Sequence, residues 1–441
     1  MKKKFKWFLL IVVLVAAVYY VKVVKQEPEP EPEVPVVEVR EEVPTRDYKL
    51  YVAAPIEYMS LRETPGLGQD VITKIYPGTL IREVGESGSA DGVVSLMMET
   101  LDGAYKGYLS ANYCIEVEYD YDAGKLTIVD TSSAIYSYDD MKADLEQICS
   151  TYPEAVSFSG IGQSAEGREI YMAVLGNPDA PRKILIQGGI HGREYMCCQL
   201  IMKMLEYYAA FYDSGYYGDL WYNELFEQTA FYVVPMSNPD GVSISQFGEA
   251  AVSDQGRLEM MRAAYERDKN TVSSYEEYLS LWKANANGVD INRNFNAGWE
   301  AIEQKSEPGG EFFKGYSPCS EPETIALENL VNSHQFDKLI SYHARGQIIY
   351  YDTVGITDEM SQSSYELAEL IHSVCKYSIV NCNDASNVVQ GGLGDWTMLE
   401  KGVESATLEI GKGECPLSIE EFKSVWYRNR EIWAKLAWTR E

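Results

Sequence analysis

Positive charge is scarce in this sequence. Among its 441 residues, 38 lysines and arginines stand against 67 aspartates and glutamates, which gives a formal net charge of −29. Proteins that bind nucleic acid need basic patches to neutralise phosphates, and adhesion to anionic lipid headgroups needs basic segments as well. The composition therefore argues against both partners. It is typical of a soluble, self-repelling surface.

Cysteine and histidine are also few. The 8 cysteines include no CxxC pair and no dense spacing, which argues against a small disulfide framework and a cysteine-based zinc site. Cys375 and Cys382 are close enough along the chain to form one disulfide. Any histidine-based metal site must be drawn from four residues: His191, His334, His343 and His372.

An apolar run interrupted by Lys22 extends from Trp7 to Val24, behind four lysines in the first six residues. About 18 to 20 apolar residues can cross a bilayer, and basic residues ahead of such a run favour an N-terminus that stays inside. We expect residues 1–25 to be a single-pass membrane anchor, with the rest of the chain outside the cytoplasm. A cleaved signal peptide, which would make the protein secreted, is the alternative, although no clear small-x-small cleavage site follows.

The next two segments differ in composition. From Glu27 to Pro35 the sequence reads EPEPEPEVP, which forms neither a helix nor a core, so residues 26–46 are expected to be a stiff, extended linker. Residues 47–119 contain short β-rich stretches separated by turn signals. These signals are Thr64-Pro65-Gly66, Pro77-Gly78 and Asp102-Gly103. Such spacing predicts a small β-barrel.

Three stretches of the predicted barrel resemble bacterial Src-homology-three-like domains. They are Met59–Gly66, Pro77–Leu80 and Gly107–Ser110. The resemblance implies a domain that binds cell-wall peptide. A spacer barrel without any ligand is the alternative.

Residues 120–441 alternate between apolar strands and helices. Continuous apolar runs between helices indicate strands that are buried on both faces. The predicted strands are Lys183–Gln187, Ala230–Val234, Leu339–Tyr342, Gln347–Tyr351 and Ala406–Glu409, and the predicted helices are Met196–Ala210, Pro322–Ser333, Met360–Cys375 and Ile419–Leu436. Two of these helices follow capping-box signals, Ser320 with Glu323 and Ser418 with Glu421. The pattern predicts an α/β/α sandwich on a mostly parallel, mixed sheet, with active groups at the carboxyl ends of strands.

Two of the four histidines follow directly on predicted strands. His191 and Glu194 form an H-x-x-E spacing at a strand-to-helix turn, and His343 ends the strand LISYH. Two histidines and one carboxylate leave a zinc ion an open position for water. His334 and His372 lie at helix ends or faces, where a solvated or structural role is expected. We therefore expect one zinc ion, held by the first three side chains.

Glu409 ends the predicted strand SATLE. A carboxylate inside an apolar run is costly unless it has a partner or a task. As a general base, Glu409 would take a proton from the zinc-bound water and pass it to the leaving amine. A structural ion pair is the alternative.

The motifs of the α/β region, taken together, resemble one enzyme family. Most of residues 120–441 resembles a zinc metallocarboxypeptidase of the carboxypeptidase A and B type. Seven motifs occur in the family's order: Gly162-x-Ser-x-Glu-Gly-Arg168, His191-Gly-Arg-Glu194, Asn238-Pro-Asp-Gly241, Asp290-Ile-Asn-Arg-Asn294, Ser320-Glu-Pro-Glu-Thr324, His343 and Thr407-Leu-Glu409. The resemblance implies that His191, Glu194 and His343 bind zinc and that Glu409 is the catalytic glutamate.

The same resemblance assigns the substrate-binding residues. Asn292 and Arg293 match the pair that grips the terminal carboxylate of the substrate, a task for which the planar fork of arginine is well suited. Arg193 matches a further arginine of the substrate cleft. The alternative for Arg293 is a surface ion pair of little energetic consequence.

The chain departs from the digestive enzymes of the family at several positions. Lys283 stands where the family has an arginine that stabilises the oxyanion. The positive charge is therefore kept, but the bidentate guanidinium group is not. The mobile tyrosine has no clear counterpart, and Asn387 falls near its place. Arg345 replaces another tyrosine. Gly394 falls at the base of the specificity pocket, where the A type has an aliphatic residue and the B type an aspartate.

Two sequence segments, WKANANGVDINRNF and SYHARGQIIYY, look closest to the bacterial branch of this family that cuts γ-D-glutamyl-diaminopimelate bonds. The resemblance implies a cell-wall peptide substrate, with Arg345 as the candidate that binds an acidic side chain. The hypothesis is a membrane-anchored metallopeptidase that hydrolyses peptide bonds near a free C-terminal carboxylate. A zinc amidase or deacylase on small acyl amino acids and a non-catalytic wall-binding protein are the alternatives.

Overall fold

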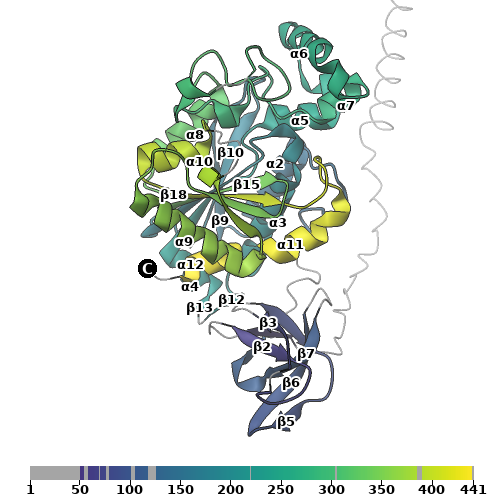
Figure 1. Cartoon of the computed structure of the whole chain (residues 1–441), viewed down its shortest axis with the longest axis vertical. Helices are drawn as coiled ribbons and strands as arrows, with labels where there is room; N and C mark the ends of the chain where they lie inside the picture. The colour runs from purple at the N-terminus through teal and green to yellow at the C-terminus, as the bar shows by residue number, and fades with distance from the viewer. Residues whose placement is uncertain are drawn as a thin grey trace, which may run out of the picture. The chain divides into compact units, whose positions relative to one another are not determined.

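The computed structural model describes residues 50–439, apart from 54–57, 69, 76–78, 101–104, 118–125, 219, 303–304 and 385–389 (Figure 1). The expected membrane anchor and Pro/Glu-rich linker, residues 1–46, lie outside the described residues. So do two of the predicted turns and Asn387. Within the described part of the chain, no helix is both long and apolar enough to cross a membrane.

Residues 50–117 form an antiparallel sheet with a small apolar core. Its strands are β1 (Leu50–Ala53), β2 (Met59–Arg62), β3 (Val71–Ile75), β4 (Leu80–Glu83), β5 (Gly88–Ala90), β6 (Val93–Thr100), β7 (Lys106–Ser110) and β8 (Cys114–Val117). They are ordered β3-β2-β7-β6-β4-β1-β8, and β5 pairs with β6. Leu61, Ile81, Met98 and Leu109 are buried between them. The short strands of this segment are confirmed, whereas the domain bounds, a closed barrel and a peptide-binding role stay predictions.

The larger sheet is mixed, as expected. Its strands are β9 (Val156–Gln163), β10 (Glu169–Leu175), β11 (Arg182–Gly188), β14 (Thr229–Val234), β15 (Lys338–Ala344), β16 (Ile348–Tyr351), β17 (Ser378–Asn381) and β18 (Glu404–Ile410). They follow the order β17-β16-β18-β15-β11-β14-β10-β9. The four central strands β18, β15, β11 and β14 run parallel, and antiparallel pairing joins β16 to β18, β10 to β14 and β9 to β10.

Helices cover both faces of this sheet (Figure 1). One face packs on α2 (Tyr138–Thr151), α3 (Met196–Ala210), α4 (Tyr222–Gln228), α9 (Asp358–Cys375), α11 (Phe422–Asn429) and α12 (Ile432–Trp438), and the other on α8 (Pro322–Ser333) and α10 (Leu393–Trp396). Alternate residues of a strand point to opposite faces. Accordingly, Ile184 and Ile186 belong to the first core and Leu185 to the second. The α/β/α sandwich is confirmed.

The predicted single helix Ile419–Leu436 is wrong, because it is broken between α11 and α12. The Tyr208 hydroxyl on α3 donates to the carbonyl of Arg430 at 2.5 Å and accepts the N–H of Ala434 at 3.0 Å. The hydroxyl thus lies between the Arg430 carbonyl and the Ala434 N–H, which would otherwise form the i to i−4 hydrogen bond of one continuous helix. This buried contact from a distant segment leaves no local signal in the sequence.

Two further local predictions are also wrong. Ser320 does not cap α8, whose N-cap is Glu321 and whose first residue is Pro322. The carboxylate of Glu323 accepts hydrogen bonds from Ala165 N–H and Asn285 Nδ2 instead, so it does not complete a capping box. All eight cysteines are free thiols, including Cys375 and Cys382.

Candidate active site

The candidate site lies where three parallel strands end side by side. Gly188 at the end of β11 is level with Tyr342 on β15, and His343 on β15 is level with Glu409 on β18. The chain leaves β11 and forms a short 3-10 helix, η3 (Gly192–Glu194), directly after His191. The carboxyl ends of parallel strands share one edge of a sheet. The topology therefore brings together side chains that are far apart in the sequence.

His191, Glu194 and His343 form a compact, buried group. Their side chains are at most 5% exposed, and their candidate ligand atoms all lie within 4.8 Å of one another. Nδ1 of His191 lies 2.9 Å from Oε1 of Glu194, and Nδ1 of His343 lies 3.1 Å from Oε2 of the same carboxylate. The two Nδ1 atoms are 3.1 Å apart. Two imidazole nitrogens that converge on one carboxylate fit a single zinc ion with a further position open.

The surroundings of this group favour the ionised form of Glu194 and fix the position of the His191 ring. Burial raises the pKa of Glu194, but the charges and hydrogen bonds of His191 and His343 more than offset it, so the pKa lies well below its ordinary value. Ala344 N–H also donates to Glu194 Oε2 at 3.1 Å. Nε2 of His191 lies 3.3 Å from Oδ1 of buried Asp290. A carboxylate behind a histidine fixes the ring orientation and leaves the other nitrogen for a metal.

Close backbone packing holds the turn that carries His191 and Glu194. Gly192 N–H donates to the carbonyl of Lys283 at 3.0 Å, and a Cβ added at Gly192 would lie 2.3 Å from the carbonyl oxygen of Gly241. Asn238 Nδ2 donates to the carbonyl of Ile190 at 3.0 Å. These contacts explain why glycine follows His191. They also tie the turn to α5 (Pro239–Phe247), which Asn238 caps.

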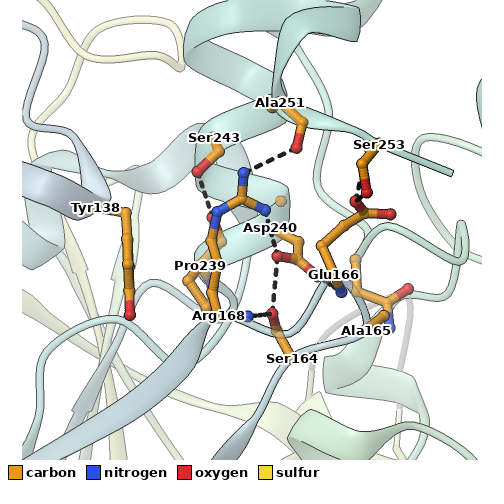
Figure 2. A network of polar contacts seen from close by, with 12 residues as sticks. Tyr138, Ser164, Ala165, Glu166, Arg168, Pro239, Asp240, Ser243, Ala251 and Ser253 are labelled. Carbon is orange, nitrogen blue, oxygen red and sulfur yellow. Dashed lines mark hydrogen bonds and ion pairs between the residues drawn. The ribbon is translucent and has the colours of Figure 1, made fainter.

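A polar network anchors α5 to the hairpin of β9 and β10 (Figure 2). Asp240 accepts hydrogen bonds from Ser164 Oγ at 2.8 Å, from Glu166 N–H at 2.7 Å and from Arg168 Nη1 at 2.6 Å. Arg168 Nη2 also donates to the carbonyl of Ala251 at 2.8 Å. Two of the sequence motifs, residues 162–168 and 238–241, therefore have a structural role, since they hold the helix against which the metal-binding turn packs.

Replacing Arg168 by alanine is expected to destabilise the protein by about 3 kcal/mol. The Asp240 side chain is fully buried and would lose its only charged partner among the described residues. The expected loss lies at the lower end of the range for broken buried pairs because Arg168 is 24% exposed. Urea unfolding followed by tryptophan fluorescence measures it.

The control for this prediction is Arg262→Ala, because Arg262 pairs with Glu249 at the surface, where both side chains are substantially exposed. Such solvent-exposed pairs contribute little to stability. An Arg168→Ala variant as stable as the Arg262→Ala variant would contradict a structural role for the network.

Glu409 lies beside the His-Glu-His group. Burial, together with the neighbouring Glu194, raises the pKa of this carboxyl to about 7 against the opposing charges of His343, Lys283 and Arg193. A carboxylate with a pKa near neutrality can both accept and return a proton at physiological pH. The position of Glu409 level with His343 suits proton transfer to and from a group held at the metal-binding site.

Three of the four predicted basic site residues take different positions around the metal-binding group. Lys283 Nζ lies 4.0 Å from Oε1 of Glu194. Arg193 Nη1 donates to the carbonyl of Leu281 at 3.2 Å and approaches Glu311 at 3.5 Å. Arg345 pairs with Glu414, and its side chain is 41% exposed. The charges of Lys283 and Arg193 lower the pKa of Glu409, whereas Arg345 pairs with an exposed acid.

A cavity of about 250 Å³ opens beside His343. Its lining residues are Asn292, Arg293, Ser341, His343, Tyr350, Tyr351, Asp352, Cys382, Gly392, Gly394, Asp395, Met398, Ser405 and Thr407. The Nε of Arg293 is buried and has no hydrogen-bond partner among the described residues. Asn292 Oδ1 accepts the N–H of Leu393 at 3.2 Å. The predicted clamp residues and Gly394 therefore lie around one cavity next to the metal-binding group.

Two acidic residues of the site were not singled out by sequence reasoning. Asp290 opens the Asp-Ile-Asn-Arg-Asn motif, so its place in that motif was a usable signal. Burial raises the pKa of Asp290, but His191, Arg293 and Lys283 more than offset it and hold the pKa below its ordinary range. Asp395 lines the cavity, and the only signal was its position directly after Gly394.

Comparisons with known proteins match the α/β region of this chain. The zinc carboxypeptidase family profile matches residues 141–432. The chain is 29% identical over 296 residues to Bacillus subtilis YqgT, covering 66% of this chain and 74% of that protein. It is 28% identical over 294 residues to gamma-D-glutamyl-L-diamino acid endopeptidase 1 of Lysinibacillus sphaericus, covering 66% of this chain and 69% of that protein.

Solved structures share the fold at low sequence identity. The crystal structure of thrombin activatable fibrinolysis inhibitor superposes with a TM-score of 0.55 at 20% identity, covering 73% of this chain and 82% of that chain. Carboxypeptidase A from Helicoverpa armigera gives a TM-score of 0.54 at 19% identity, covering 70% and 75%. The family profile spans most of the α/β region and includes the buried His-Glu-His group. The chain belongs to the zinc carboxypeptidase family and is a zinc metallopeptidase.

Proposed function

We propose that this peptidase hydrolyses cell-wall peptides at a bond close to a free C-terminal carboxylate. The observation that carries the proposal is the position of Asn292 and Arg293 on a cavity that also borders His343. A carboxylate bound by this pair would place the preceding peptide bond next to the metal-binding group. The name of the Lysinibacillus sphaericus relative, a γ-D-glutamyl-L-diamino acid endopeptidase, supports a substrate of the peptidoglycan type.

In the proposed mechanism, His191, Glu194 and His343 hold one zinc ion. When bound, zinc acidifies water and polarises a substrate carbonyl. Glu409 accepts a proton from the attacking water and returns it to the leaving amine. Lys283 brings positive charge towards the developing oxyanion, and Arg193 adds a second positive charge to the cleft. Asp290 orients the ring of His191 through Nε2.

Replacing Arg293 by alanine is expected to raise KM by about 10- to 100-fold for peptides with a free C-terminus. The reason is the loss of charged hydrogen bonds, which contribute about 1.5–3 kcal/mol each when fully formed. Peptides with an amidated C-terminus should lose much less, because they carry no charge for Arg293 to bind. Steady-state kinetics on the matched pair of substrates measures the difference, and the surface variant Arg262→Ala is the control. Equal losses on both substrates would contradict the clamp.

Arg345 is the proposed contact for an acidic group on the substrate. Its guanidinium pairs with Glu414, whose side chain is 86% exposed, so the pair can open at little cost. The Arg345 position directly after β15 lies next to Ala344, which donates to Glu194. An acidic substrate group that replaces Glu414 would thus be held close to the zinc site.

The test of the proposed function is the digestion of defined muropeptides by the purified protein, with and without a chelator. Mass spectrometry identifies the bond that is cleaved. We expect cleavage that is lost on chelation and restored by zinc. Cleavage of acyl amino acids but not of peptides would favour an amidase or deacylase. Absence of metal-dependent cleavage of any substrate would contradict the proposal and favour a wall-binding protein without catalytic activity.

The N-terminal segments suggest where this activity takes place. We propose that residues 1–25 anchor the chain in the cell membrane, that residues 26–46 are a spacer, and that residues 47–119 are a Src-homology-three-like domain. The apolar run Trp7–Val24 and the alternating Pro and Glu residues support this arrangement. Cell fractionation of the full chain tests it: recovery in the soluble extracytoplasmic fraction would indicate a cleaved signal peptide instead.

A further inference from the structure

Lys283, the proposed oxyanion-stabilising residue, has a flexible side chain. Lysine carries a point charge on a mobile stem, whereas arginine presents a planar fork that limits its own orientation. Lys283 Nζ lies 4.0 Å from Glu194 Oε1, and the lysine side chain is 12% exposed. This ammonium would be repelled by a zinc ion held at Glu194, because both charges are positive. Lys283 therefore needs a further contact that keeps its charge beside the metal-binding group.

The ring of Phe312 supplies such a contact. Lys283 Nζ lies over this ring, 5.5 Å from its centre. An ammonium within about 6 Å of an aromatic ring centre is attracted by the negative charge of the ring face, and more strongly where water is excluded. A carboxylate in the same place would neutralise the ammonium, but an uncharged ring does not. The positive charge of Lys283 thus stays available to an oxyanion.

The backbone on both sides of Phe312 is tied to the same part of the site. The carbonyl of Gly310 accepts the N–H of Lys283 at 2.8 Å. Phe312 N–H donates to Asp290 Oδ2 at 3.3 Å, and Asp290 N–H donates to the carbonyl of Phe313 at 2.7 Å. These hydrogen bonds fix the backbone that carries the ring relative to the backbone of Lys283.

Phe312 adopts a left-handed backbone conformation, with a φ of 64°. This conformation is unfavourable for a bulky side chain, whereas glycine adopts it without strain. Residues in such conformations persist where the surrounding structure over-determines them, and they cluster at functional sites. The strain at residue 312 therefore indicates that its ring has a task that the backbone alone does not fulfil.

We propose that Phe312 is a positioning residue, whose ring holds the ammonium of Lys283 where it can stabilise the oxyanion. The inference rests on the proposed function, because it takes Lys283 to act on the transition state. Loss of a contact that matters mainly in the transition state lowers kcat and leaves KM almost unchanged. The loss expected from one desolvated contact between an ammonium and a ring is about 5- to 30-fold.

The test uses the full chain, loaded with zinc, and a muropeptide that the wild-type protein cleaves. Phe312→Leu keeps an apolar side chain and the same backbone strain but lacks the ring. We expect its kcat to fall by about 5- to 30-fold, with KM within about twofold of the wild-type value. Phe312→Tyr keeps the ring and should retain most of the wild-type kcat. Tyr316→Leu is the control, because the Tyr316 ring is exposed and lies edge-on against Phe313.

A double-mutant cycle with Lys283→Met shows whether Phe312 acts through the lysine. Lys283→Met alone should lower kcat by about 10²-fold or more, the loss that follows removal of an oxyanion contact. Phe312→Leu should then cause almost no further loss, because the effects of coupled residues do not add. Equal losses from Phe312→Leu in both backgrounds, or no loss in either, would overturn the inference. A Lys283→Met variant with the wild-type kcat would overturn the proposed role of Lys283 as well.

A spectroscopic readout tests the contact independently of activity. An aromatic ring moves the NMR signals of groups over its face upfield. In protein made with isotope-labelled lysine, the ε-methylene signal of Lys283 is the one that is absent from the Lys283→Met variant. We expect it upfield in the wild-type protein and in Phe312→Tyr, and at an ordinary position in Phe312→Leu. If no peptide is hydrolysed, the proposed function fails, and this signal decides whether Phe312 positions Lys283: a signal that Phe312→Leu leaves unmoved would exclude it.

Discussion

Replacing Glu409 by glutamine is expected to lower kcat by about 10²- to 10⁴-fold, the range over which a positioned general base contributes. Glutamine has the same shape and fills the same place at the end of β18, but it cannot accept a proton. Zinc content should stay at one per chain, because His191, Glu194 and His343 are untouched. Steady-state kinetics together with metal analysis measures both quantities.

The pH dependence gives a second readout for Glu409. Burial raises the pKa of its carboxyl to about 7, and the positive charge of bound zinc lowers it from that value. A base works only when deprotonated, so kcat/KM of the wild-type protein should fall as pH falls through this pKa. The residual activity of the Glu409→Gln variant should lack that acid limb.

A matched control is available on the same strand. Glu404 lies at the other end of β18, where it pairs with Lys338 at 2.7 Å, and Glu404→Gln should leave kcat and the acid limb unchanged. If Glu409→Gln retained more than a tenth of the wild-type kcat, Glu409 would be no more than a structural partner of His343 and Lys283.

Sequence reasoning succeeded where one local pattern determines both the element and the place of a polar residue near its carboxyl end. The runs LISYH and SATLE lie in strands β15 and β18, each of which continues for one residue beyond the polar side chain, and the parallel pairing of these strands places His343 level with Glu409. The H-x-x-E spacing also determines the position of its residues, since His191 ends an extended segment and η3 turns Glu194 back towards it. In each case the order of residues along the chain is enough to predict which side chains lie close together.

Sequence reasoning failed where contacts with a distant segment determine the local structure. The break between α11 and α12 depends on Tyr208, more than two hundred residues earlier. The Glu323 carboxylate caps nothing on its own helix because Asn285 and the Ala165 N–H compete for it. Asp395 was missed for the same reason, because only the folded chain brings its helix, α10, to the cavity that borders His343.

Replacing His343 by alanine is expected to abolish zinc binding and, with it, all metal-dependent cleavage. Three protein ligands leave a catalytic zinc site with little redundancy, and the loss of one removes a nitrogen that lies 3.1 Å from the Glu194 carboxylate. In the wild-type protein, the three ligand groups converge in the folded state, so zinc should raise the midpoint of thermal unfolding. The gain is about 4 kcal/mol at a free zinc concentration of a thousand times Kd. Calorimetric titration and thermal melts with and without zinc measure the two effects.

His334→Ala is the matched control, because His334 lies at the end of α8 and its Nδ1 contacts the carbonyl of Leu330 rather than the site. This variant should bind one zinc ion and keep the zinc-dependent rise in the melting midpoint. The comparison separates a ligand from a structural histidine. A His343→Ala variant that still binds one zinc with wild-type affinity would exclude His343 as a ligand, and the metal would then have to be held elsewhere than at the ends of β11 and β15.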